Sequence, residues 1–489
     1  MASAGTWGFY GRQRELNKLS DVFGRGRWFF LRLTGRRRIG KTTLVQRALA
    51  ANREVLYVQI PDSQPSGVIG AVTEAMETFR LNEERYPRPT SLIELARLVS
   101  KMARDGMVVV LDEFQYFSRT RLLEFTSALQ AEVDQLSANS EEVPGGLVVL
   151  GSLHTEIAAL LEDRNAPLYN RTTDEIALGH LNAAAVAEIV RSHANYSAEH
   201  LLFLWSLFEG VPKFYRDCFE QGVIGADRKA LLQQIFFESS SPLRYEAENW
   251  FLKEFRGQYD VVLKYVARNP GANHADIKAA VTSDRENEKQ VGGYIKTLTD
   301  KFQMIEKRLP VFAKPKARKN RYYIFDNFLS SWLAALASPV AAMNFRPVDQ
   351  LGEDAEARLK VCEGYSREKL AAQLYEERSR TGVGDFQLTD RIQGYWNSPD
   401  TEIDLVALDA DHKRIRFGSC KRSSADLVVG AKQLDGHVDR FLKAFPKYTT
   451  WNIDRVAIAP SVPDDVRTSV ESLGHIVQSI DELLDGVVA

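Results

Sequence analysis

The sequence predicts an α/β protein whose N-terminal part is built on a parallel sheet. Three observations support this fold class. A glycine-rich segment lies between a β-prone run and a helical stretch near the start of the chain. A continuous apolar run further on fits a strand buried on both faces of a sheet. It ends in two acidic residues, at the carboxyl end of the strand, where open α/β sheets bind ligands. Helical and β-prone stretches then alternate through residues 1–180.

Length and composition set the frame for this prediction. A chain of 489 residues is too long for one hydrophobic core, so several domains are expected. The net charge of −2 indicates neither a polyanion nor a membrane partner, and any basic patch must be local. The three cysteines form no disulfide framework or metal-ligand spacing, which fits a reducing, cytoplasmic compartment. No uncharged run approaches the ~18 residues that a membrane-spanning helix needs.

Residues 34–44, TGRRRIGKTTL, contain the phosphate-loop pattern G-x-x-x-x-G-K-[ST]. The pattern is made by Gly35, Gly40, Lys41 and Thr42. Glycines let backbone N–H groups curl around phosphate oxygens, and Lys41 can reach the β- and γ-phosphates. The Thr42 hydroxyl can ligate Mg²⁺, and a helix over residues 43–52 aims its positive end at the anion. The β-prone run 28–33 supplies the preceding strand, a context that a plain surface turn would lack.

A second strand is expected at residues 54–60, followed by helices over 66–80 and 91–105. The apolar run 107–111 then predicts a buried strand that ends at Asp112 and Glu113. Asp112 is placed to hold Mg²⁺, and Glu113 is placed to orient and deprotonate an attacking water. An acidic pair that merely caps a strand is the alternative. The upstream loop favours a nucleotide site made by the loop residues with Thr43, Asp112 and Glu113, and we add Arg12 and Arg38 as nucleotide contacts.

The rest of this region predicts a helix over 121–136, a strand over 146–150, a helix over 155–162 and a last strand over 175–178. Ser152 follows the fourth strand. It could sense the γ-phosphate through the bound water, or it could simply end the strand. With the strand before the loop, five strands are expected.

The segments FYGRQREL, TGRRRIGKTTL, LDEFQYF, LGSL and PLYNRTT resemble the archaeal-type ATPase family, a branch of the AAA+/STAND P-loop NTPases of the ASCE class. The resemblance implies the sheet order 5-1-4-3-2 and ATP as the nucleotide. It also implies that Arg171 contacts a γ-phosphate, in cis or from a neighbouring subunit of a homo-oligomer. From the residues alone, Arg171 could equally form a surface salt bridge.

Residues 181–245 read as a helical lid domain and 246–345 as a winged helix. In the lid, Pro212 marks an ordinary helix start, and the resemblance adds that it lies next to the nucleotide. The winged helix is expected from helical stretches at 259–268, 273–280 and 286–302 and from β-prone runs at 304–311 and 321–325. The tip between these runs, residues 314–321, is basic. It fits phosphate contact with DNA or RNA, or else a solvated loop beside helices that clamp two domains.

Residues 346–489 are expected to form the last domain, after a polar linker at 346–354. A helix with Glu368, a strand with Asp404 and a following strand ending at Lys421 resemble the PD-(D/E)XK, restriction-endonuclease-like fold. Its chemistry needs carboxylates around Mg²⁺ and a lysine near the attacking water. Ser419 stands where that pattern has Glu or Asp, so we expect a degraded site that binds rather than cuts. An active nuclease and a plain Asp404–Lys421 ion pair are the alternatives.

These predictions combine into one functional hypothesis, a Mg²⁺-dependent ATPase that serves as a conformational or assembly switch. The alternative is an ATP-gated nucleic-acid-binding regulator or nuclease effector.

Overall fold

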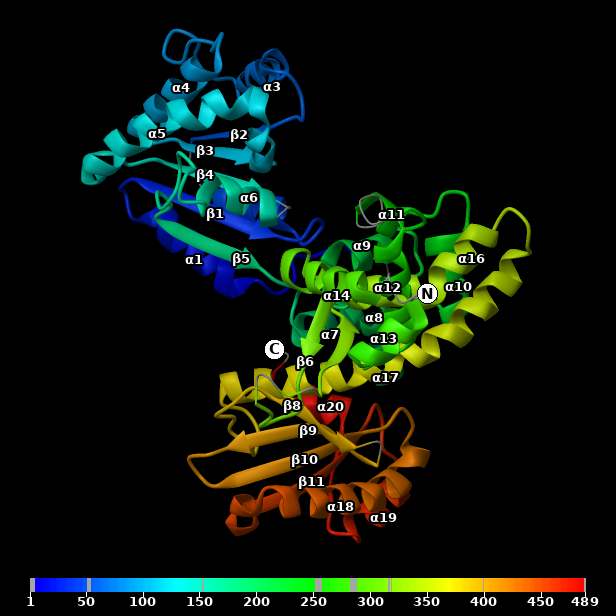
Figure 1. The fold of residues 1–489 in the computed structure, drawn as a ribbon. Coiled ribbons are helices and arrows are strands. Elements are labelled where there is room, and N and C mark those ends of the chain that lie inside the picture. Colours follow the sequence, from blue (N-terminus) through cyan, green and yellow to red (C-terminus); the bar gives the residue numbers. More distant parts are fainter. Residues whose placement is uncertain are drawn as a thin grey trace. The chain divides into compact units, whose positions relative to one another are not determined.

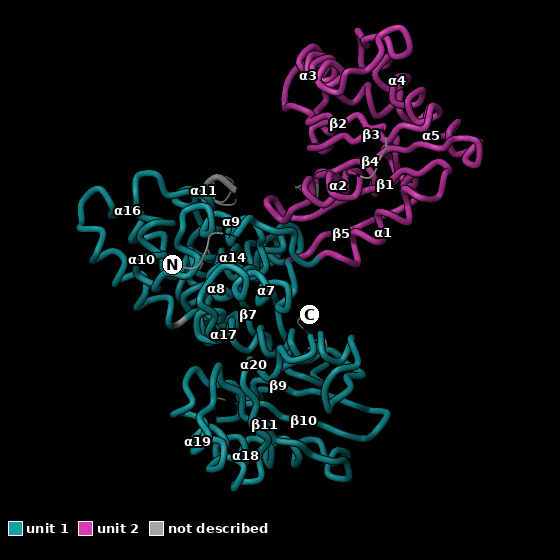
Figure 2. Tube along the Cα trace, turned by 180° about the vertical axis from the view of Figure 1, so that it is seen from behind, with its two compact units in different colours: residues 1–11, 181–489 teal, residues 12–180 magenta. Residues whose placement is uncertain are grey.

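The computed structural model describes residues 5–50, 54–151, 154–250, 257–281, 288–314, 317, 319–398 and 400–487. The chain divides into two compact units, one of residues 12–180 and one of residues 1–11 with 181–489 (Figure 2). The N-terminal arm therefore belongs to the second unit and the phosphate loop to the first.

The first unit is built on a five-stranded parallel sheet in the order β2-β3-β4-β1-β5 (Figure 1). The predicted order is confirmed. The strands are β1 (Phe29–Gly35), β2 (Val55–Gln59), β3 (Val108–Asp112), β4 (Gly146–Gly151) and β5 (Asp174–Leu178). The sequences VVVLD and GLVVLG are buried at every position, as strands covered on both faces must be.

Alternating residues of β1 pack on opposite faces of this sheet. Trp28 and Phe30 join a core with the helices that follow β2 and β3. The ring of Phe29 points the other way and lies 5.5 Å from that of Phe23 in the first helix. The helices of the unit are α1 (Gln13–Gly24), α2 (Lys41–Leu49), α3 (Pro65–Thr78), α4 (Leu92–Arg104), α5 (Leu123–Ala138) and α6 (His154–Leu161).

The second unit begins with helices where the lid was predicted. They are α7 (Ala183–His193), α8 (Ala198–Phe208), α9 (Pro212–Glu220), α10 (Arg228–Leu232) and α11 (Glu246–Trp250). Next come α12 (Gln258–Arg268), α13 (His274–Val281), α14 (Glu288–Lys296) and an antiparallel pair of strands, β6 (Ile305–Arg308) and β7 (Arg321–Ile324). Short helices α15 (Asn327–Ser331) and α16 (Ala337–Ala342) complete this part.

The C-terminal part holds a mixed sheet in the order β12-β11-β10-β9-β8, covered by helix α18 (Leu427–Ala444). Strands β8 to β10 are antiparallel neighbours, and β11 and β12 continue in parallel. The strands are β8 (Gln393–Ser398), β9 (Thr401–Asp409), β10 (Arg414–Cys420), β11 (Asn452–Ala459) and β12 (Ile476–Ser479). Helices α19 (Asp464–Glu471) and α20 (Ile480–Leu484) flank β12.

The predicted linker at 346–354 is wrong. Helix α17 (Val348–Thr381) begins there and runs for 34 residues, through the position of Glu368. Pro347 precedes its first residue, where a proline starts rather than breaks a helix. Leu351, Ala355 and Leu359 repeat at four-residue spacing and are all buried, so an apolar stripe begins inside the supposed linker and continues beyond it.

Within the described residues, no helix is long and apolar enough to cross a membrane. All three cysteines are buried and free.

Candidate functional site

The phosphate loop joins β1 to α2 with a backbone shaped for close approach. Gly40 has φ 93°, a left-handed conformation that suits glycine, and it is the N-cap of α2 without a side-chain cap. The first N–H groups of the helix are therefore left for an anion. Arg38, at the exposed crest of the loop, also has a positive φ of 65°.

Lys41 is almost fully buried at the start of α2. Its ammonium donates to the carbonyl oxygens of Gly35 at 2.8 Å and Arg36 at 3.1 Å, both within the loop. Burial lowers the pKa of Lys41, and the nearby Asp112 and Glu113 carboxylates oppose that shift. The Lys41 ammonium thus lies at the loop, and phosphate oxygens could replace the two carbonyl oxygens as its hydrogen-bond acceptors.

Thr42 and Asp112 supply a pair of oxygen atoms suited to Mg²⁺. The Thr42 hydroxyl donates to Asp112 Oδ2 at 2.9 Å, although 70 residues separate the two in the chain. A hydroxyl and a carboxylate are hard oxygen ligands, so these residues fit the metal that the sequence predicts. Thr43 lies beside them in the first turn of α2.

Glu113 lies just beyond β3 in a left-handed conformation, with φ 55°. The amide of Gln115, a buried side chain, donates to its carboxylate. The backbone N–H of Glu113 donates to Asp112 Oδ1 at 2.8 Å. The predicted acid pair is thus brought to one sheet edge together with the loop, and its two carboxylates are held by separate donors.

Three comparisons with known proteins bear on this arrangement. Residues 332–433 match a family model, DUF234, described as archaeal and bacterial proteins of unknown function. An uncharacterized protein of Methanocaldococcus jannaschii is 22% identical over 417 residues, or 84% of this chain and 87% of its own. A Walker-type ATPase structure of Pyrococcus abyssi has a TM-score of 0.51 at 18% identity, covering 66% of this chain and 96% of that one. The fold is that of Walker-type P-loop ATPases.

One weaker likeness is to the ORC2 protein of Aeropyrum pernix in its ADPNP–ADP complexes. Its TM-score is 0.45 at 14% identity, covering 71% of this chain and 94% of that one.

Arg171 of this P-loop ATPase fold lies away from the phosphate loop. It donates to both oxygens of Asp134, at 2.7 and 2.9 Å, and lowers the pKa of that carboxyl. It precedes β5, whereas the loop follows the parallel strand β1, so the two stand at opposite ends of the strands. Their separation along the sheet is roughly 13 Å or more. In this structure Arg171 forms the surface salt bridge that was the alternative, and its role toward a γ-phosphate, in cis or in trans, stays a prediction.

The other predicted contacts are only partly brought together. Arg12 donates to the carbonyl oxygen of Gly179 at 2.6 Å and more weakly to that of Ile39, so it ties the loop to the end of β5. Ser152 lies outside the described residues. Pro212 opens α9 in the other unit, as the helix-start interpretation predicts.

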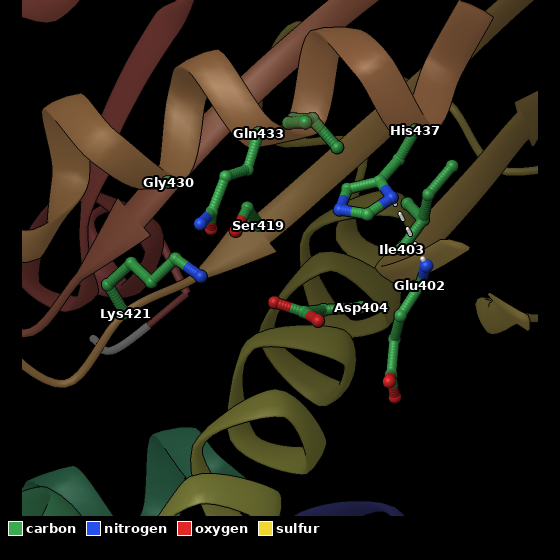
Figure 3. Close-up of a pocket in the computed structure, with 9 residues that line it drawn as sticks. Glu402, Ile403, Asp404, Ser419, Lys421, Gly430, Gln433 and His437 are labelled. Atoms are coloured by element: carbon green, nitrogen blue, oxygen red, sulfur yellow. Dashed lines mark hydrogen bonds between the residues drawn. The ribbon is translucent and has the colours of Figure 1, made fainter. Parts of the chain in front are cut away.

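The C-terminal sheet carries a cavity of about 210 Å³. Asp404, Ser419 and Lys421 line it from the strand side, and Gln433 and His437 line it from α18 (Figure 3). The Lys421 ammonium forms no hydrogen bond or ion pair with any described residue. The predicted ion pair with Asp404 is therefore not formed, although both groups face the same space (Figure 3).

Gly430 explains how Lys421 enters this cavity. The lysine side chain crosses α18 at Gly430, where an added Cβ would lie 2.3 Å from its Cε. Any other residue at that helix position would displace the lysine.

His437 presents a donor to the same space. Its Nδ1 faces the backbone N–H of Glu402 and the guanidinium of Arg440, each at 3.3 Å, so the proton of the neutral ring lies on Nε2. Burial, with help from Arg440, lowers the pKa of His437 and favours this neutral form.

The two carboxyls of the predicted nuclease-like site are electrostatically coupled. Burial raises the pKa of Glu368, and the Asp404 charge raises it further. Burial also raises the pKa of Asp404, while the N–H of Cys420, which donates to it at 2.7 Å, lowers it. Ser419 adds a hydroxyl where the predicted pattern has a third acid, so the donor set carries one carboxylate fewer than that pattern.

In the predicted basic tip at 314–321, some of the positively charged side chains already bind groups of the C-terminal sheet. Arg321 pairs with Glu402, which lines the cavity, and Lys319 donates to Asn397. The indole N–H of Trp396 donates to the Lys319 carbonyl at 2.9 Å. Residues 315, 316 and 318 lie outside the described part. The described end of the hairpin is thus fixed to the C-terminal sheet, which differs from the predicted solvated loop beside clamping helices.

Proposed function

We propose that the first unit binds ATP with Mg²⁺ and hydrolyses it slowly, and that the nucleotide state switches the conformation or assembly of the chain. The observation that carries this proposal is the convergence of Lys41, Thr42, Asp112 and Glu113 on one sheet edge. Lys41 would exchange the loop carbonyls for phosphate oxygens, and the N–H groups at the start of α2 would hold them.

Thr42 and Asp112 would hold Mg²⁺, which neutralises charge on the phosphates when bound. Glu113 would orient a water and accept its proton. The Gln115 amide holds the Glu113 carboxylate and would set its direction.

The test uses the full chain and its Glu113→Gln variant. We expect wild-type turnover that needs Mg²⁺, and in Glu113→Gln tight ATP binding with turnover reduced by about 100-fold or more. Glu124→Gln, an exposed acid on α5, is the matched control and should leave turnover unchanged. Equal turnover in Glu113→Gln and Glu124→Gln would remove the role given to Glu113.

The switch itself is tested on the same samples by light scattering with and without ATP and Mg²⁺. We propose that Arg171 acts in trans, so its Asp134 pair must open when subunits meet. In that case Arg171→Ala lowers turnover only where ATP promotes assembly. A monomer under every condition would exclude the trans role.

A second candidate function is a nucleic-acid-binding regulator gated by ATP. The helices α12 to α14 with the β6–β7 pair follow the element order of a winged helix, and the cavity at Asp404 and Lys421 suits a phosphodiester. Metal-dependent nicking that disappears in Asp404→Ala would establish cleavage, whereas binding without nicking fits the loss of an acid at Ser419.

A further inference from the structure

The strand β2 places an unassigned side chain beside the acid that should hold the metal. Tyr57 donates its hydroxyl hydrogen to Asp112 Oδ2, the oxygen that also accepts from Thr42. Tyr57 is half-buried and lies in the middle of a strand at the edge of the sheet.

The strand register explains how this contact is made. Tyr57 pairs with Val110, so Asp112 is two residues further along β3 on the same face. Two residues span about 7 Å along a strand, a gap that a tyrosine can bridge and a short polar side chain cannot. Leu56 and Val58 face the opposite side, in the core with α3 and α4.

The hydrogen bonds around Asp112 show that Tyr57 and Thr42 hold the same carboxylate oxygen. In this structure Oδ2 accepts from both hydroxyls and Oδ1 accepts from the N–H of Glu113. When Thr42 turns an oxygen lone pair toward a metal, its hydroxyl hydrogen can still donate to Asp112, because the oxygen carries two lone pairs beside its O–H. Tyr57 is a second side-chain donor to Oδ2, and it reaches that oxygen from strand β2 rather than from the start of α2.

We propose that Tyr57 is a positioning residue for the metal ligand Asp112, which it holds in the orientation that binds Mg²⁺ with ATP. This inference rests on the proposed function. Donors to a ligating carboxylate commonly change metal affinity by 10- to 100-fold when removed.

The experiment measures Mn²⁺, a probe for Mg²⁺, by electron paramagnetic resonance on the full chain with a non-hydrolysable ATP analogue. We expect Tyr57→Phe to weaken Mn²⁺ binding by about tenfold and to leave nucleotide affinity in EDTA unchanged. Turnover at saturating Mg²⁺ should fall less than turnover at low Mg²⁺, because a positioning defect is overcome by metal. Tyr86→Phe is the matched control, since it removes a hydroxyl from a buried tyrosine of the core on the other face.

The Asp112→Asn background supplies a second measurement. There Tyr57→Phe should add no further loss, because the hydroxyl acts through that carboxylate. Mn²⁺ affinity in Tyr57→Phe equal to that in Tyr86→Phe would overturn the inference alone. A wild-type chain that binds neither the analogue nor Mn²⁺ would overturn the proposed function as well.

Discussion

Single carboxyl groups of the C-terminal part carry charge that burial makes costly. Glu368 and Asp404 lie close enough to raise the pKa of Glu368, and the positive groups Arg367 and Arg308 only partly offset this. The folded state thus holds a proton more tightly at Glu368 than the unfolded chain does.

The pH dependence of stability follows from this tighter proton binding by Glu368 in the folded state. Below pH 4.5, the ordinary pKa of the group, both states are protonated and Glu368 contributes no difference. As the pH rises above that value the unfolded state ionises first, so stability is lost. We therefore expect Glu368→Gln to raise the melting temperature increasingly from pH 5 to pH 8. Glu353→Gln, an exposed acid on the same helix, should show no widening gap, and a constant gap for Glu368→Gln would contradict the assignment.

At the scale of elements, the β6–β7 hairpin is a clamp on the C-terminal sheet. The N–H of Val311 donates to the Gly394 carbonyl at 2.9 Å, which covers part of the edge strand β8. The ring of Phe312 stacks on that of Tyr448 with their centroids 5.1 Å apart.

Removing a side chain of this clamp should weaken the contact between the β6–β7 hairpin and the C-terminal sheet and so lower stability. Phe312 is 37% exposed, so we expect Phe312→Ala to lower the free energy of unfolding by about 2 kcal/mol, less than for a fully buried ring. Phe345→Ala is the control, because Phe345 is 85% exposed and should change stability by less than about 0.5 kcal/mol. Urea denaturation followed by tryptophan fluorescence measures both unfolding free energies. If Phe312→Ala lowers the unfolding free energy by no more than Phe345→Ala does, the clamp is not stabilising.

Sequence patterns predicted these elements well where the signal was local. The loop at Gly40 and the acid at Asp112 were found because a motif and an apolar run mark them. Tyr57 was missed because its contact depends on strand register, which no single segment specifies. The start of α17 was missed because its polar residues outnumber the apolar stripe at Leu351. The docking of Phe312 was missed because a loop residue gives no periodic signal.

At the scale of the second unit, one buried ion pair joins the lid segment to α17. Glu209, at the end of α8 with φ 50°, accepts from the Lys369 ammonium at 2.7 Å and from the N–H of Asn327 at 3.1 Å. The side chains of Glu209 and Lys369 are 4% and 13% exposed. Gly210-Val211-Pro212 follows directly, and Lys369 is the neighbour of Glu368.

Breaking this pair should remove the lysine cation from a buried carboxylate. We expect Lys369→Met to cost about 3 kcal/mol of unfolding free energy. Adding Glu209→Gln should recover part of this loss, since the buried carboxylate charge is then removed as well. Lys229→Met is the control, because Lys229 pairs with exposed acids and should cost at most about 1 kcal/mol. Chemical denaturation of the four variants measures the coupling, and strict additivity would contradict it.

Helix α17 gives these contacts a mechanical meaning. With 34 residues it is about 51 Å long, and a hydrogen-bonded helix scarcely stretches. Its Glu377 accepts from the N–H groups of Ala183 and Ala184 at the start of α7, while its Glu368 interacts electrostatically with Asp404, which lines the cavity. If nucleotide moves the lid helix α7, the rigid helix α17 would transmit that movement to the C-terminal sheet and its cavity. By thermodynamic reciprocity, a ligand bound in the cavity would then change the affinity for nucleotide by the same factor as nucleotide changes the affinity for that ligand.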